Sequence, residues 1–138
     1  MANHILKVEV SWTGKNFCCS WSDEDAGSVV VTAKTLIQLK HDFEQSLGWH
    51  IEGCVEDGDV IPEYLVSGDY EVAYELDTAA LLRDAETYTT MAAISRASGI
   101  NQKQLSHYAN GIKQPRPLQR ERIIAGLHTI GSQILALC

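Results

Sequence analysis

The chain has 138 residues, is 45% hydrophobic and carries a formal net charge of −7 at pH 7. These values exclude wholesale disorder and allow either one ordinary domain or two small ones. No apolar run reaches the roughly 18 residues of a membrane span, and the N-terminus lacks the basic and apolar regions of a signal peptide. We therefore expect a cytoplasmic protein without a membrane segment.

The charge is divided unevenly along the chain. Residues 1–77 hold 4 Lys and 15 Asp plus Glu, a net of −11, whereas residues 78–138 hold 7 Lys plus Arg and 3 acids, a net of +4; together these give −7. The asymmetry predicts two domains, 1–77 and 78–138. The basic domain suits nucleic-acid phosphates and the acidic one a basic protein partner. An acidic face that only aids solubility is the alternative reading of the first domain.

The four cysteines show no metal-binding pattern. They lie at Cys18, Cys19, Cys54 and Cys138, with no C-x-x-C spacing and no histidine at zinc-finger distance. We interpret all four as reduced, structural thiols and expect neither a metal nor a cofactor. The adjacent pair falls in a predicted strand, where neighbouring side chains point to opposite faces, so at most one of the two is buried.

Hydrophobic alternation predicts three strands at the start of the chain. Residues 5–12 alternate strictly, the stretch 13–16 is turn chemistry, and the alternation resumes over 17–21. A polar loop over 22–27 leads to a β-branched third strand over 29–31. The result is a three-stranded meander with one apolar face that needs a cover.

The predicted cover is a helix, followed by a fourth strand. Thr32 can cap a helix that begins near Ala33, and its apolar residues recur at helical spacing as far as Gly48, a plausible stop, or Ile51. The stretch 50–63 is rich in Gly and acid and reads as loop, with a short turn near Tyr64. Alternation over 70–76 then predicts a strand. The order β-β-β-α-β indicates an α+β fold with its helix on one face of the sheet.

Residues 78–138 read as an all-α domain organised around the stretch 91–111. A helix capped by Asp77-Thr78 precedes it. Within it, Gly99 separates two short helices, the first capped by Thr89 or Thr90, the second by Asn101 with Gln104 reaching back as in a capping box. The residues expected to be buried between the helices are Ile94, Ile100, Leu105 and Tyr108.

After the closing pair Asn110-Gly111, two prolines interrupt the chain before a last helix over 118–137. This helix carries an apolar stripe with 4-3-4-3 spacing, at Ile123, Leu127, Ile130, Ile134 and Leu137, broadened by Ile124 and Leu135. The stripe covers the core of the domain. Core packing alone explains it as well as contact with a second copy does.

The pattern over 91–111 resembles the helix-turn-helix of lambda-repressor-like (XRE-type) regulators, with Ser95 where that family prefers Ala. Such a motif places its second helix in the major groove of DNA; an αα-hairpin that only packs is the alternative. Candidate base contacts are Gln102, Lys103 and His107, with Ser106 touching base or phosphate. Asn110, Lys113 and Arg116 follow the helix, where phosphate contacts are commoner, and Arg96 lies on the first helix. Plain solvated charge is the alternative for Lys113 and Arg116, and a water-facing side chain for His107.

Across both domains, the chain resembles the HicB family of antitoxins, in the subset that carries a C-terminal helix-turn-helix. The stretches HIEGCVEDGDVIPEYL, SGDYEVAYELD, GINQKQLSHYANG and PRPLQRERIIAGL carry this resemblance. It implies a partial RNase H-like N-terminal domain that neutralises a HicA toxin, a small basic RNA-cleaving protein. It also implies a C-terminal domain that binds the operator of the pair's own genes. We expect the helix-turn-helix to bind operator DNA as a homodimer or a higher even oligomer. A stand-alone regulator with no toxin partner is the alternative.

An enzymatic function is the weakest reading. An RNase H-like sheet with Glu9 on its first strand invites metal-dependent nuclease chemistry, which needs three or four converging carboxylates. The acids here cluster in loops instead. The chain also shows no Ser/His/Asp order, no phosphate-cradling Gly loop and no H-E-x-x-H. We therefore expect a protein that binds rather than one that catalyses.

Overall fold

The computed structural model describes residues 4–138 and has the α+β class expected from the sequence. The chain divides into two compact units, Met1–Asp77 and Thr78–Cys138. The division falls at the residue where the charge of the chain changes sign. Each unit has a hydrophobic core of its own.

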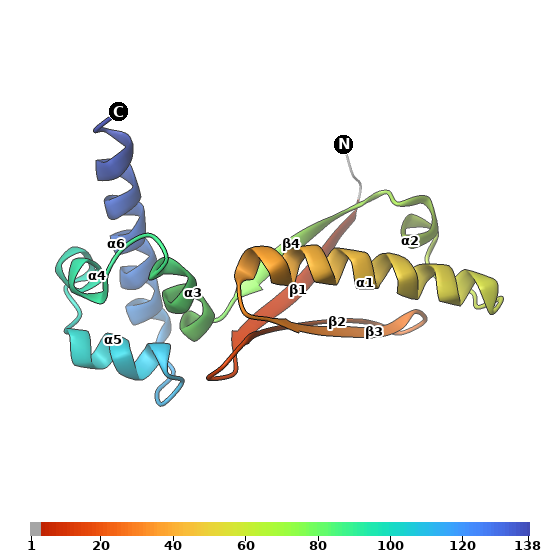
Figure 1. Cartoon of the computed structure of the whole chain (residues 1–138), viewed down its shortest axis with the longest axis horizontal. Helices are drawn as coiled ribbons and strands as arrows, with labels where there is room; N and C mark the ends of the chain where they lie inside the picture. Colours follow the sequence, from red (N-terminus) through yellow and green to blue (C-terminus); the bar gives the residue numbers. More distant parts are fainter. Residues whose placement is uncertain (1–3) are drawn as a thin grey trace. The chain divides into compact units, whose positions relative to one another are not determined.

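The N-terminal unit is built on a four-stranded mixed sheet (Figure 1). Its strands are β1 (His4–Trp12), β2 (Phe17–Asp23), β3 (Gly27–Ala33) and β4 (Tyr70–Leu76), in the order β3-β2-β1-β4. The first three form the predicted antiparallel meander, and β4 pairs in parallel with β1. The polar loop between β2 and β3 is shorter than expected, because its first residues belong to β2 and its last residue to β3. Asp23 pairs with Gly27, and only a tight turn remains between them.

Helix α1 (Leu36–Glu56) covers one face of this sheet (Figure 1). The apolar side chains that alternate along the strands point toward this helix, so that the sheet and the helix bury each other's apolar surface. From the sheet come Leu6, Val8, Val10, Phe17, Cys19 and Trp21; from α1 come Leu39, Phe43, Leu47, Ile51 and Cys54, all of them buried. Only Cys19 of the adjacent cysteines is fully buried, as expected, and this burial raises the pKa of its thiol to about 11.

Both predicted ends of α1 are wrong. The helix begins later because β3 continues to Ala33, and Thr35 rather than Thr32 accepts the capping hydrogen bond, from the Gln38 amide. It also runs through Gly48 to Glu56, so that most of the expected loop over 50–63 is helical. A glycine inside a helix costs about 1 kcal/mol, and the burial of Ile51 and Cys54 beyond it outweighs that cost. The short helix α2 (Glu63–Ser67) then takes the place of the predicted turn.

The C-terminal unit consists of four helices: α3 (Thr78–Ala85), α4 (Met91–Ser98), α5 (Gln102–Ala109) and α6 (Pro117–Leu135). The last helix begins and ends a little earlier than predicted, with proline in its first turn, where its missing N–H costs nothing. The buried residues of this unit are Leu82, Ile94, Ile100, Leu105, Tyr108, Ala109 and Ile123. They include all four residues expected to be buried between α4 and α5.

Gly126 sets the approach of α6 to α4. A Cβ atom added there would lie 3.0 Å from the backbone nitrogen of Ser98 and 3.2 Å from its Cα. Both atoms belong to α4, which packs along α6, so neither can move without moving a helix. A side chain at this position would therefore push the two helices apart.

No helix within 4–138 is both long and apolar enough to cross a membrane. The same residues contain no group of three or more His, Cys, Asp or Glu placed to hold a metal ion. All four cysteines are free thiols, but Cys138 is exposed, so the expectation of a structural role is wrong for this one. It lies past the end of α6, where there is no core to enter.

Substitution of Gly126→Val should lower the free energy of unfolding of the C-terminal unit by about 2–3 kcal/mol, because overpacking forces α4 and α6 apart. Gly131→Val is the matched control: it lies on the same helix with no atom within 4 Å of its added Cβ, and should change stability by less than about 0.5 kcal/mol. Urea unfolding followed by circular dichroism at 222 nm measures both. Tryptophan fluorescence reports the N-terminal unit separately, since Trp12, Trp21 and Trp49 all lie there. Equal losses in the two variants would contradict this role of Gly126.

Candidate nucleic-acid interface

Local hydrogen bonds determine where α4 ends and α5 begins. The Thr90 hydroxyl accepts from the Ala93 amide at 3.1 Å, and the Asn101 side chain accepts from the Gln104 amide at 2.8 Å, so each helix has the predicted cap. Between them Gly99 adopts the left-handed conformation, with φ at 75°, which favours glycine because it has no Cβ. The Ser95 hydroxyl closes the turn by donating to the Ile100 carbonyl at 2.6 Å.

One half of the predicted capping box is absent. The side-chain amide of Gln104 does not reach back to the head of α5, but donates to the hydroxyl of Tyr108 at 2.8 Å. Residues four apart lie on the same side of a helix, and the buried Tyr108 needs a partner for its hydroxyl group. The amide of Gln104 is thereby engaged on the flank of α5 and not at its start.

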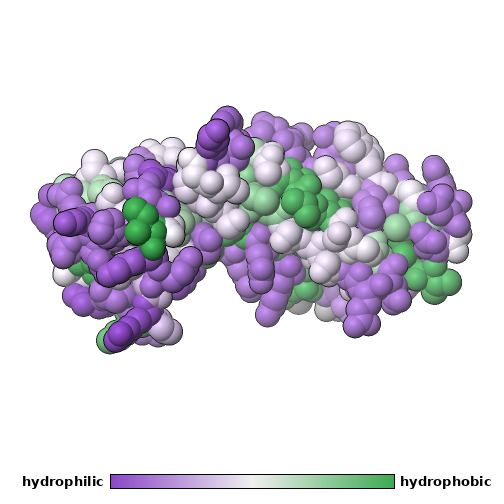
Figure 2. All heavy atoms as spheres, turned by 90° about the horizontal axis from the view of Figure 1, so that it is seen from below, coloured by the Kyte–Doolittle hydropathy of each residue, from purple (hydrophilic) through white to green (hydrophobic). Residues whose placement is uncertain are grey.

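The outer face of α5 is polar and unobstructed. Gln102, Lys103 and Ser106 are exposed, and His107 is partly exposed, whereas Leu105 and Tyr108 point into the core. In Figure 1, α5 lies on the lower side of its unit; seen from that side, the surface of this unit is mostly hydrophilic (Figure 2). All four candidate residues expected on this helix therefore lie on one face that water, or a ligand, can reach.

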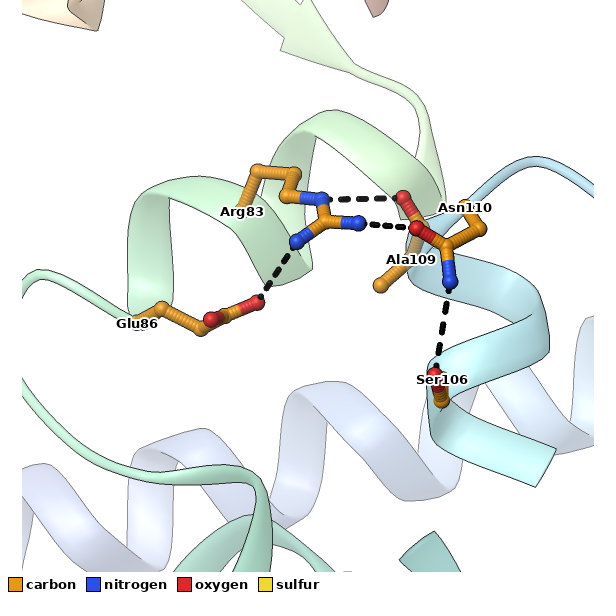
Figure 3. Close-up of polar contacts among 5 residues, drawn as sticks. All are labelled: Arg83, Glu86, Ser106, Ala109 and Asn110. Carbon is orange, nitrogen blue, oxygen red and sulfur yellow. Dashed lines mark hydrogen bonds and ion pairs between the residues drawn. The ribbon is translucent and has the colours of Figure 1, made fainter. Parts of the chain in front are cut away.

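Arg83 of α3 holds the C-terminal end of α5 (Figure 3). Its Nε donates to the Ala109 carbonyl at 3.1 Å, its Nη2 donates to the Asn110 side-chain oxygen, and its Nη1 pairs with Glu86 at 3.4 Å. The Asn110 amide in turn donates to the Ser106 hydroxyl at 3.4 Å. The guanidinium thus caps the negative end of the helix dipole. Two candidate contact residues, Ser106 and Asn110, are joined in this network and are not free.

Two further candidates, Lys113 and Arg116, lie in the loop after α5. With Gln104 and Tyr108 they line an open hollow of about 590 Å³ between that helix and the start of α6. Their side chains are exposed, as is that of Lys103, and none of these three side chains makes a hydrogen bond or ion pair with the residues 4–138. The loop therefore places two unpaired cations beside the polar face of α5.

Arg96 is the one candidate that the structure places elsewhere. It lines a different hollow, with Ala93 and Ala97 of α4 on one side and Gln133, Ile134 and Leu137 at the end of the chain on the other. The end of α6 lies on the side of the unit away from α5 (Figure 1). The structure thus brings seven of the eight predicted residues together along α5 and its following loop, and separates Arg96 from them.

Three basic residues that were not predicted as part of this region also shape it. Besides Arg83, the Arg122 side chain donates to the Gly99 carbonyl at 3.4 Å, and Arg120 donates to the Thr78 hydroxyl at 2.8 Å. Each joins elements far apart in the sequence, so no spacing within the 91–111 pattern reveals it. Their common effect is to fix the helices and not to add free charge to the outer face.

The N-terminal unit presents a second surface, the sheet face opposite α1. Glu9 of β1 lies beside Glu75 of β4 in the parallel register, and Lys7 lies 4.0 Å from the Glu75 carboxylate. With Ser20 and Ser28 these residues line a shallow hollow of about 300 Å³. Glu9, the residue that suggested nuclease chemistry, thus has one carboxylate neighbour on this face. The other residues that line the hollow with it include serines and a lysine.

Comparison of the chain with models of known families, with curated proteins and with solved structures finds no match. The chemistry of the site therefore rests on its own residues. Along α5 and its loop these supply side-chain amides, an imidazole, a hydroxyl group and free cations on an exposed face. Cations can pair with anionic groups, and side-chain amides can donate and accept hydrogen bonds.

Substitution of Arg83→Met should speed hydrogen exchange at the amides of the last turn of α5 and lower the stability of the C-terminal unit by about 1–2 kcal/mol, because the Ala109 carbonyl loses a charged donor. Arg116→Met is the control, since that exposed side chain makes no such bond. Amide exchange followed by NMR measures the local effect. Unchanged protection in Arg83→Met would show that the guanidinium does not hold this helix.

Proposed function

We propose that the C-terminal unit is a helix-turn-helix that binds duplex DNA with α5 in the major groove, and that the protein regulates transcription. The main support for this proposal is the polar outer face of α5, which is flanked by the unpaired cations of Lys113 and Arg116. The net charge of +4 on this unit supports it, because phosphate neutralisation dominates DNA affinity.

Each residue of this face has a role suited to its chemistry. Gln102 bonds an adenine through its amide, Lys103 a guanine, and His107 a third base edge. Lys113 and Arg116 pair with phosphates on the same side. Ser106 and Asn110 take a positioning role through Arg83 and offer phosphates only what hydrogen-bonding capacity remains. Base reading therefore rests on three residues of one short helix.

We further propose that the protein is an antitoxin of the HicB type, whose N-terminal unit binds and blocks a small basic RNA-cleaving toxin. The favouring observation is the charge of −11 on a unit that also presents an open sheet face with Glu9 and Glu75. Charge of this kind raises the rate of association with a basic partner. The stand-alone regulator would lack only this second activity.

Substitution of Gln102→Ala should cost about 1–3 kcal/mol in binding to the preferred duplex and relax the preference at one base pair, since one bidentate contact is lost. Selection from a random duplex library, repeated with the variant, measures the change. Glu52→Ala on α1, an exposed residue of the other unit, is the control. Two results would refute the assignment of Gln102. Either the native chain enriches no sequence, or the variant enriches the same sequence as the native chain at every position.

Substitution of Lys113→Ala should weaken binding to all duplexes about equally and reduce the slope of log affinity against log salt by about 1, because one phosphate contact is lost. Titration of one selected and one scrambled duplex at several salt concentrations measures it. A loss confined to the selected duplex would place Lys113 at a base instead.

The double charge reversal Glu9→Lys plus Glu75→Lys should slow association with a basic toxin encoded beside this gene and abolish protection of growth when the two are co-expressed. Glu121→Lys, an exposed reversal on α6, is the matched control and should protect normally. If the native chain binds no neighbouring gene product, the stand-alone regulator is the better description.

A further inference from the structure

The strand β4 forms one edge of the N-terminal sheet, and some of its backbone groups face no partner strand. Within residues 4–138 it pairs with β1 on one side and with no strand on the other. The Asp77 amide, directly after β4, donates to the Val10 carbonyl of β1 at 2.9 Å. Because backbone groups alternate in direction along a strand, the Ala73 amide also faces β1, and the amides of Val72 and Tyr74 point to the open edge. No described residue accepts a hydrogen bond from either of these two amides.

The apolar side chains of β4 are only partly covered. Leu6 and Val8 of β1 are 4% and 0% exposed, whereas Val72 and Tyr74, their neighbours in register on β4, are half-buried. The cause is the position of α1, which packs over β2 and β3. The other edge of the sheet, β3, therefore already lies beneath the helix, and its Val29 is buried. An additional strand beside β4 would cover the apolar side chains that α1 leaves open.

The side chain of Tyr74 is already held in the position that such a strand would contact. Its hydroxyl group donates to the Lys40 carbonyl of α1 at 3.3 Å, and the Lys40 ammonium group lies 5.1 Å from its ring centroid. The Phe43 ring meets it edge-on, with 6.2 Å between the centroids. A surface that is ordered before binding loses less conformational entropy when a partner arrives.

The opposite face of β4 is acidic. Glu71 and Glu75 alternate with the apolar side chains and are exposed, and Glu9 of β1 lies beside Glu75. An added strand therefore meets apolar groups on one face and carboxylates on the other. A second copy of β4 does not fit, because antiparallel pairing about Ala73 places Glu71 of each copy opposite Glu75 of the other. Like charges directly opposite each other destabilise a pair of strands.

We propose that β4 accepts an extended segment of a basic partner protein as an additional strand, with apolar and basic residues alternating along that segment. Strand addition gains affinity from main-chain hydrogen bonds and specificity from alternate side chains. The apolar side chains of the segment pack against Val72 and Tyr74, and its lysines or arginines meet Glu71 and Glu75 across the strands. This inference deepens the proposed binding of a basic protein and rests on that proposal for the identity of the partner.

A seven-residue peptide of alternating lysine and valine, as long as β4, is the probe. Titration of the labelled peptide with the full chain, followed by fluorescence anisotropy, should show saturable binding. A peptide with the same residues in two blocks should bind about tenfold more weakly, because it lacks the alternation. Bound peptide should slow hydrogen exchange at the Val72 and Tyr74 amides by about tenfold and leave the Ala73 amide unchanged.

Three results of this experiment overturn the inference. The first is that the alternating peptide does not bind. The second is binding without slower exchange at Val72 and Tyr74, which would show association by charge alone. The third is slow exchange at these two amides before the peptide is added, rising with protein concentration, which would show that a second copy already occupies the edge.

Two substitutions separate the backbone from the charges. Val72→Pro removes an amide at the open edge without removing a bond to β1, and proline is tolerated on edge strands. It should weaken peptide binding by about tenfold or more, whereas Val72→Ala, which keeps the amide, should weaken it by about threefold or less. Glu71→Lys should weaken binding by about fivefold, and Glu52→Lys on α1 is the exposed control of equal charge. Equal losses in the two Val72 variants, with both folded by circular dichroism, overturn the inference.

The inference and the proposed function can fail separately. A neighbouring toxin that binds the native chain and Val72→Pro equally well would overturn strand addition and leave the antitoxin proposal standing. A chain that adds the peptide to β4 but binds no neighbouring gene product would refute the antitoxin proposal and support the edge as a docking site.

Discussion

The fixed position of α5 is the constraint on which the C-terminal unit depends. Eight residues form only two turns, and a helix of that length is unstable alone. It persists because Leu105 and Tyr108 enter a core shared with Ile94 and Ile123, and because each end is held by a hydrogen bond from outside the helix. The Asn101 cap and the Ser95 hydroxyl fix its start, and Arg83 fixes its end. One face of α5 and its two ends therefore hold the helix in place. On the other face, the exposed side chains of Gln102 and Lys103 make no hydrogen bond with the described residues.

The same separation of tasks holds for the charges of this unit. Of its seven basic side chains, Arg83, Arg120 and Arg122 donate to carbonyls and hydroxyls within the unit. The other four make no such bond with the described residues; Lys103, Lys113 and Arg116 lie on or after α5, and Arg96 lies on α4. A positive charge held inside a network contributes to stability and to the field of the protein, but only a free one can pair with a phosphate without breaking a bond. The net charge of +4 therefore describes the field that DNA would meet, and the three free cations on and beside α5 describe the contacts.

Local signals in the sequence account for what could be predicted. The alternation in residues 5–12 and 70–76, the caps at Thr90 and Asn101 and the turn at Gly99 all involve neighbours within four residues, and the structure has each of them. The errors arose where a distant contact outweighed a local preference. The helix α1 continues through Gly48 because the sheet buries Ile51 and Cys54, and Gln104 turns away from the helix start because Tyr108 offers a partner in the core. Arg83 was missed for the same reason: its partners lie 26 and 27 residues ahead in the chain.

Arg96 shows how a local pattern can misplace one side chain. By sequence it belongs to a helix next to the reading helix, and a cation there is naturally assigned to a phosphate. In the structure it lies with Ile134 and Leu137, on the side of the unit that α5 does not occupy. A position on the helix before α5 therefore does not by itself place a side chain on the polar face of α5, because α4 also packs against α6 and presents residues on that side.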